Sequence, residues 1–182
     1  MSVPNPSTVT TRARRAATAL GVVTAGAALL LAGCSGSASA QTGSPSAATV
    51  QEGGTVRFGT PFTYGDGLFV EARVPTTFTP TSQAESLEGV EGTPVRIRLK
   101  ITNGTRAPFT PHTLDASVVS GGEPAVQIED PGSQIALTGP GLELRSAGTS
   151  TFDLGFVVTD PRDITLTIVP AIGGYDPLVV TS

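Results

Sequence analysis

Cys34 is the one thiol in the sequence, and its surroundings point to chemistry at that sulfur during export. It follows Gly33 at the end of residues 16–32, a run without charged side chains, and three arginines precede that run. A basic head, an apolar middle and a small-residue processing site are the parts of an export signal. Directly after Cys34 the composition changes to serine, glycine, alanine, threonine and proline. We therefore interpret residues 1–33 as a signal peptide whose processing site is the cysteine.

The four residues Leu31-Ala32-Gly33-Cys34 resemble a bacterial lipobox, the motif of lipoprotein signal peptides. The resemblance implies that Cys34 is diacylated, carries fatty acids such as palmitate, and becomes the first residue of the mature protein. The mature protein would then be anchored in the cell membrane on its extracytoplasmic face. Each buried methylene contributes about 0.8 kcal/mol, so a diacylglycerol anchors a protein stably where a single chain does not.

Two other interpretations of this N-terminal segment remain open. One is a signal peptide that is cleaved without lipidation. The other is a permanent transmembrane helix, for which residues 16–32 lie at the short end of the spanning range and are diluted by glycine and threonine.

Arg96, Arg98 and Lys100 form a second group of residues with chemical potential. They alternate with four aliphatic residues, Val95, Ile97, Leu99 and Ile101. An alternation of period two places the three cations on one face of a half-buried strand. Such a row is a candidate docking surface for an anionic glycan, a lipid headgroup or an acidic protein. The alternative, favoured because cross-strand charge pairs are ordinary, is a solvated face whose cations pair with acids on neighbouring strands.

His112 is the only histidine, and the sequence offers it no partners for catalysis. No Gly-x-Ser-x-Gly motif surrounds any serine, and Cys34 is taken by the predicted lipid. The mature chain has no methionine either, which argues against a copper or zinc site. The acidic pairs Glu129-Asp130 and Asp160/Asp163 are better explained as turn residues than as ligands of a hard metal ion. We therefore predict a protein that is not an enzyme and needs no cofactor.

The elements that must position these residues lie after a predicted linker. Residues 34–50 contain almost no charged, aromatic or bulky aliphatic side chains, so they predict a flexible tether. Residues 51–182 predict one folded domain. From Cys34 onward, eight basic residues stand against fifteen acids, so the mature chain has a net charge of −7. This charge argues against nucleic acid as a partner.

The folded part is predicted to be all-β. Short alternating or apolar runs are separated by glycine- and proline-containing turns, and crossover helices for a parallel sheet are missing from the pattern. One helical turn is predicted at Ser82–Glu85, which matches a capping box. The predicted strands are 55–58, 68–74, 94–102, 114–119, 125–128, 150–158, 164–168 and 178–180, with a further short segment at 135–137. Seven to nine strands of this kind indicate an antiparallel β-sandwich.

Three segments of this domain resemble DUF4352-type Ig-like lipoprotein domains and their secreted immunoprotective-antigen relatives. They are Gly54-Thr55-Val56, the strand 95–102 that ends in Asn103, and the strand 150–158 that follows Ala147-Gly148. The resemblance covers roughly residues 52–182, although the spacing between the first two strands departs from the family pattern. It implies an Ig-like sandwich and brings no catalytic residues with it.

Two functions follow as hypotheses. The first is a lipid-anchored Ig-like domain that binds an envelope protein or glycan without catalysis. The second is a carrier of a small apolar ligand or lipid, held between the sheets by four phenylalanines: Phe58, Phe62, Phe152 and Phe156.

Overall fold

The computed structural model describes residues 49–85 and 87–182. Cys34, the predicted signal peptide and most of the predicted tether lie outside the described residues. The described part contains two short 3-10 helices, η1 (Pro111–Thr113) and η2 (Pro131–Ser133). Its strands are β1 (Gly54–Arg57), β2 (Phe62–Thr63), β3 (Leu68–Ala72), β4 (Thr76–Thr77), β5 (Thr93–Asn103), β6 (Asp115–Ser120), β7 (Glu123–Pro124), β8 (Val126–Ile128), β9 (Thr149–Val158), β10 (Ile164–Val169) and β11 (Leu178–Thr181).

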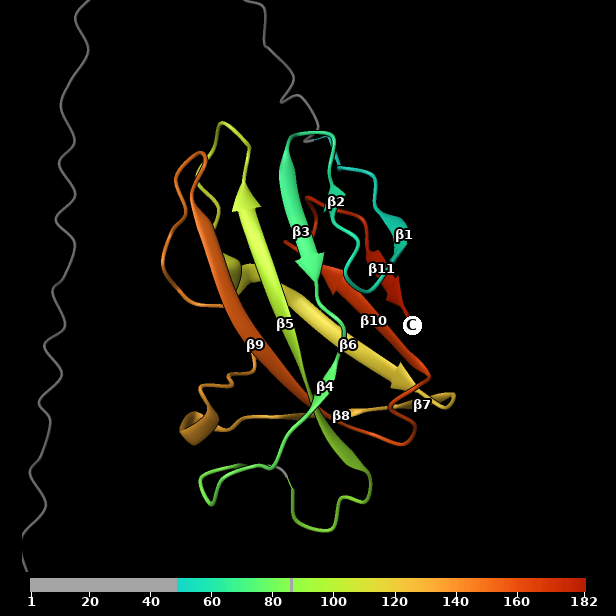
Figure 1. The fold of residues 1–182 in the computed structure, drawn as a ribbon. Coiled ribbons are helices and arrows are strands. Elements are labelled where there is room, and N and C mark those ends of the chain that lie inside the picture. Colours follow the sequence, from blue (N-terminus) through green and yellow to red (C-terminus); the bar gives the residue numbers. More distant parts are fainter. Residues whose placement is uncertain (1–48, 86) are drawn as a thin grey trace, which may run out of the picture. The chain divides into compact units, whose positions relative to one another are not determined.

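These strands form two sheets that pack face to face as a sandwich (Figure 1). One sheet has the order β1-β11-β10-β6-β7, and the other has the order β2-β3-β5-β9-β8 with β4 added beside β5. Only β2, β4 and β7 are two residues long, which leaves eight longer strands within the described residues. The prediction of an all-β sandwich is confirmed.

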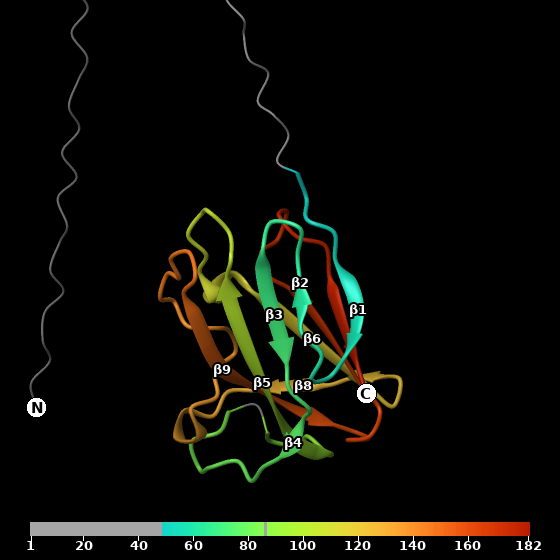
Figure 2. The same ribbon diagram turned by 45° about the horizontal axis from the view of Figure 1, so that its top comes forward.

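The long strands β5 and β9 form the centre of the second sheet, and Figure 2 shows them beside β3. The alternation of β5 is regular: Val95, Ile97, Leu99 and Ile101 are each at most 1% exposed and face the other sheet. From β10 of that other sheet come three further buried residues, Ile164, Leu166 and Ile168. Burial of these aliphatic side chains stabilises the sandwich at roughly 25 cal/mol per Å² of apolar surface. The polar side chains of β5 are thereby fixed on the outer face.

One strand pair departs from the predicted antiparallel arrangement. β1 pairs in parallel with β11, and Gly54 lies opposite Leu178. The two segments enter their strands from the same end of the sandwich, where Gln51 forms a parallel bridge with Tyr175. After β1 the chain crosses to the second sheet within a short turn. There the Gly59 N–H donates to the carbonyl of Ala72, at the end of β3.

The predicted short strand at 135–137 does not form, and residues 142–144 form none either. Ile135 makes single bridges to Asp130 and Asp153, and Leu144 makes one to Phe109. Each of these aliphatic side chains is buried by itself, at 2% and 7% exposure, while its neighbours turn outward. Because a strand needs several consecutive pairs, one buried residue in a turn-rich segment produces only a bridge.

Asn103, at the end of β5, is fully buried. Its side-chain amide donates to the carbonyls of Ala107 (2.8 Å) and Leu144 (2.7 Å), and its oxygen accepts from the Thr105 N–H (3.0 Å). These bonds satisfy a polar group that burial would otherwise penalise. They fasten the end of β5 to the loop that precedes β9.

Candidate functional site

The arginines of β5 lie on the outer face of the second sheet, as the alternation predicts. The side chains of Arg96 and Arg98 are 38% and 51% exposed. The aliphatic residues between them anchor the strand in the core, so the two guanidinium groups are held at fixed positions along it. The outer face therefore presents two cations that are two residues apart on the same strand.

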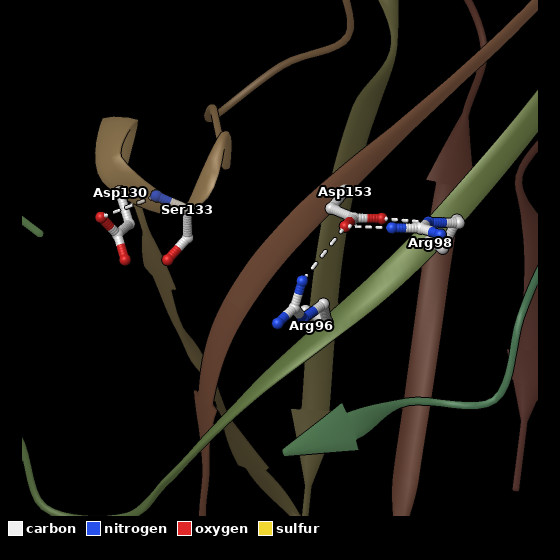
Figure 3. A network of polar contacts seen from close by, with 5 residues as sticks. All are labelled: Arg96, Arg98, Asp130, Ser133 and Asp153. Atoms are coloured by element: carbon white, nitrogen blue, oxygen red, sulfur yellow. Dashed lines mark hydrogen bonds and ion pairs between the residues drawn. The ribbon is translucent and has the colours of Figure 1, made fainter. Parts of the chain in front are cut away.

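Asp153 joins the two arginines from the neighbouring strand β9 (Figure 3). It lies directly opposite Arg98, and its two oxygens accept hydrogen bonds from Nε (2.8 Å) and Nη2 (2.9 Å) of that residue. Arg96 approaches the same carboxylate at 3.7 Å. The Arg98 hydrogen bonds lower the pKa of Asp153 below its ordinary value and outweigh burial, which would raise it. The carboxylate is thus charged at neutral pH and bound bidentately.

One carboxylate between two guanidinium groups leaves a surplus of one positive charge. Arg98 donates two hydrogen bonds to Asp153, whereas Arg96 makes only one contact with that carboxylate, at 3.7 Å. The Arg96 guanidinium also lies over the ring of Phe78, 5.5 Å from its centroid, which holds its side chain by a cation–π contact. Arg96 is therefore the cation with the greater capacity for an added anion.

Lys100 belongs to the same row but points to other neighbours. It lies opposite Glu71 of β3, and its ammonium group is 5.7 Å from the ring centroid of Phe69. Arg96 and Arg98 are brought together by Asp153, and Lys100 is placed toward β3 instead. The predicted row of three cations is thus a pair of arginines with a lysine beside it.

Two hollows in the surface flank the arginine pair. The first has a volume of about 250 Å³ and is lined by Arg73, Val74 and Thr76 together with the arginine pair. The second has a volume of about 310 Å³, and its lining adds five residues to the arginine pair: Ser133, Gln134, Thr151, Phe152 and Asp153. Arginines dominate the lining of the first hollow, whereas serine, glutamine and threonine residues join the arginine pair in the second. A chain-like ligand that crosses the arginines would therefore meet two different surfaces.

The rim of the second hollow is built by η2, which Asp130 holds in place. Asp130 is fully buried, and its carboxylate accepts from the Thr81 N–H (2.9 Å), the Thr81 hydroxyl and the Ser133 N–H (3.3 Å). Burial alone would raise the pKa of this carboxyl, but the hydrogen bonds from Thr81 and Ser133 lower it to about 2. The same contacts explain why Ser82–Glu85 does not form the predicted helical turn: Thr81 is drawn to Asp130, and Glu85 bridges Glu129.

Gln134 follows η2 in a left-handed conformation, with φ 58° and ψ 34°. This conformation is unfavourable for a residue with a Cβ, by roughly 1 kcal/mol or more. Glycine is the ordinary residue for such a position after a helix. Gln134 is one of the residues that line the second hollow.

Gly155 allows the η2 segment to lie close to β9. A Cβ at this position would come 2.9 Å from Cγ2 of Ile135 and 3.4 Å from Cβ of Ile128. Both isoleucines are at most 2% exposed, so they have little room to move. The glycine, opposite Arg96 in the strand register, thereby fixes the rim of the hollow relative to the arginines.

The sequence reasoning missed Asp153, Phe78 and Gln134 as members of this site. The outward position of Asp153 on its strand was visible in the alternation of residues 150–158, but its partner depends on the register between β5 and β9. The single histidine lies elsewhere: His112 is exposed in η1, and its Nδ1 is 3.0 Å from the Thr138 hydroxyl.

The phenylalanines that a carrier would need help to form the core. Phe156 is 1% exposed within it, and the other three, Phe58, Phe62 and Phe152, are partly buried and pack against it. Phe62 also makes an edge contact with the ring of Tyr64, with centroids 4.9 Å apart. These rings fill space between the sheets, and no specific contact in the described residues favours a carrier.

A search of residues 49–85 and 87–182 for membrane-spanning helices finds none that is long and apolar enough. Cys34 lies outside this range, so its lipidation stays a prediction from the sequence.

Comparison with family models finds no match to this chain, and comparison with curated proteins finds none either. Two solved structures are similar to it in fold. The yjhA protein from Bacillus subtilis has a TM-score of 0.54 and 12% identity, over 69% of this chain and 97% of that one. MPT63, a secreted protein from Mycobacterium tuberculosis, has a TM-score of 0.50 and 16% identity, over 70% of this chain and 96% of that one. The resemblance seen in the sequence is thus supported at the level of the β-sandwich fold that the chain shares with these two proteins.

Proposed function

We propose that this protein is a lipid-anchored extracytoplasmic binding module that acts without catalysis on an envelope protein or glycan. Diacylated Cys34 is the anchor in this proposal, and the face around Arg96, Arg98 and Lys100 is the binding surface. The export signal in the sequence supports the location, as does the fold shared with MPT63, which is a secreted protein.

The observation that carries the proposal is the sharing of one carboxylate by two arginines. Asp153 neutralises one charge, so a cation surplus remains on an exposed face of a domain that is otherwise acidic. Complementary charge contributes to the rate and specificity of association more than to affinity alone. An anionic group on an envelope partner fits such a face.

The test is crosslinking on intact cells that carry the full chain, followed by recovery of the protein and its bound partners. We expect a reproducible protein or glycan partner whose recovery falls at least fivefold in the variant Arg96→Ser/Arg98→Ser/Lys100→Ser. The matched control is Arg57→Ser/Arg145→Ser/Arg162→Ser, which removes the same charge from other parts of the domain. Equal recovery with both triple variants would contradict the proposed face.

The anchor has a separate test. We expect Cys34→Ala to remain as unprocessed precursor and to lose labelling by palmitate, because the thiol is the predicted acceptor of the diacylglyceryl group. Continued palmitate labelling of this variant would disprove lipidation at Cys34.

A further inference from the structure

The arginine pair has room for a single added negative charge. Arg98 is occupied by Asp153 through two hydrogen bonds, whereas Arg96 meets the same carboxylate at 3.7 Å. Arg73, which lines the first hollow, lies 3.7 Å from Glu71. With Lys100, which lies opposite Glu71, four cations on this face stand against the carboxylates of Glu71 and Asp153. The face has a surplus of two positive charges, and one of them belongs to the arginine pair. A ligand with one carboxylate at this point matches the surplus.

The surroundings disfavour a ligand with dense negative charge. Residues 49–85 and 87–182 carry eight basic side chains and fifteen acidic ones, so the domain repels polyanions beyond the arginine pair. An acidic peptide or a phosphate polymer would place further charges against this field. A ligand whose carboxylates are separated by uncharged groups avoids that cost.

The second hollow offers neutral hydrogen-bonding groups beside the arginines. The hydroxyl groups of Ser133 and Thr151 can each donate and accept hydrogen bonds. The amide of Gln134 donates through its NH₂ group and accepts through its oxygen. A few polar groups that line one hollow suit a ligand that carries several hydroxyl groups.

We propose that this face binds an acidic polysaccharide, with the carboxylate of a uronic acid unit on Arg96 and the hydroxyl groups of an adjoining sugar in the hollow at Gln134. The inference rests on the proposed function and names the ligand class of the same surface. The chain of sugars crosses the outer face of the sheet beside η2. The hydrogen bonds of the Asp130 carboxylate to Thr81 and Ser133 keep the rim of the sugar subsite in position.

The test is calorimetric titration of the full chain, purified in detergent, with three probes of equal length. They are an oligogalacturonate with half of its carboxyl groups reduced, so that neutral sugars separate the remaining carboxylates, its fully reduced neutral form, and oligoglutamate. We expect oligogalacturonate to bind at least tenfold more tightly than either of the others. Arg96→Ser lowers its affinity at least tenfold, and Gln134→Gly lowers it about threefold or more. Arg145→Ser, which removes a cation elsewhere, leaves the affinity unchanged.

Each other outcome is decisive. Oligoglutamate binding as tightly as oligogalacturonate, with the same dependence on Arg96, would overturn the sugar inference while the proposed binding face stands. Failure of all three probes, with cell capture still dependent on the arginine pair, would also overturn the inference alone. Capture that is independent of the arginines would remove the proposed function together with the inference.

Discussion

Asp153 and Arg98 lie directly opposite each other on β9 and β5, and the carboxylate accepts two hydrogen bonds from one guanidinium group at 2.8 and 2.9 Å. The carboxylate is 9% exposed and the arginine side chain is 51% exposed, so one partner is fixed in the sheet and the other reaches into solvent. Because Arg98 binds this carboxylate through two hydrogen bonds, the charge of Arg96 is neutralised only in part.

Removal of the Asp153 charge is expected to have opposite effects on stability and on anion binding. Asp153→Asn lowers the free energy of unfolding by about 1 kcal/mol, a modest value because Arg98 is half exposed and solvent screens the pair. The same change frees both arginines, so binding of oligogalacturonate becomes tighter. Urea unfolding measures the first effect and calorimetric titration the second. Asp163→Asn, in an exposed turn, is the control and changes neither; weaker binding by Asp153→Asn would contradict the charge argument.

Gln134→Gly separates conformational strain from ligand binding. Glycine accepts the left-handed conformation without a Cβ penalty, so the free energy of unfolding stays equal to that of the wild type or rises by up to about 1 kcal/mol. Ala147, with φ 64°, is the only other non-glycine residue with positive φ in the described residues and lines neither hollow. We expect Ala147→Gly to show the same stability change with unchanged sugar binding. A loss of sugar binding in both variants would show that the effect of Gln134→Gly is not specific to the amide group.

Gly155→Ala tests how closely η2 is packed on β9. The added methyl group meets Ile135 at 2.9 Å, so the rim must shift, and we expect a loss of about 1–3 kcal/mol in the free energy of unfolding. Gly141→Ala is the matched control, because a Cβ there has no neighbour within 4 Å and its φ is not positive. Equal thermal midpoints for the two variants would mean that the η2 segment moves away from β9 without a loss of stability.

Asp130 predicts a dependence of stability on pH in the acid range. Its pKa is lowered to about 2 in the folded protein, so the unfolded chain takes up the proton first as the pH falls. The contribution of Asp130 is therefore fully present above about pH 4 and is lost as the pH falls toward 2. Thermal unfolding of the wild type and of Asp130→Asn between pH 7 and pH 2 checks this. We expect the difference between their midpoints to shrink below pH 4; a constant difference would rule out titration of this group.

The sequence predicts well what depends on local pattern and poorly what depends on distant partners. The alternation in residues 94–102 places Arg96 and Arg98 on the outer face correctly, because one strand between two layers can only face two ways. The ion pair with Asp153 depends on a register between segments 55 residues apart, which no local pattern encodes. Ser82–Glu85 fails as a helix for a similar reason, since the buried carboxylate of Asp130 takes the N–H and the hydroxyl of Thr81.

The parallel pairing of β1 with β11 has a consequence for how this domain is made. Gly54 meets Leu178, so these contacts are among the most distant in sequence and close the largest loop of the fold. Under the proposed export from the N-terminus, the four-residue β1 emerges long before the strand that it must join. On that proposal the first sheet is completed only after β11 has crossed the membrane. The shortness of β1 limits the surface it offers to wrong partners during that interval.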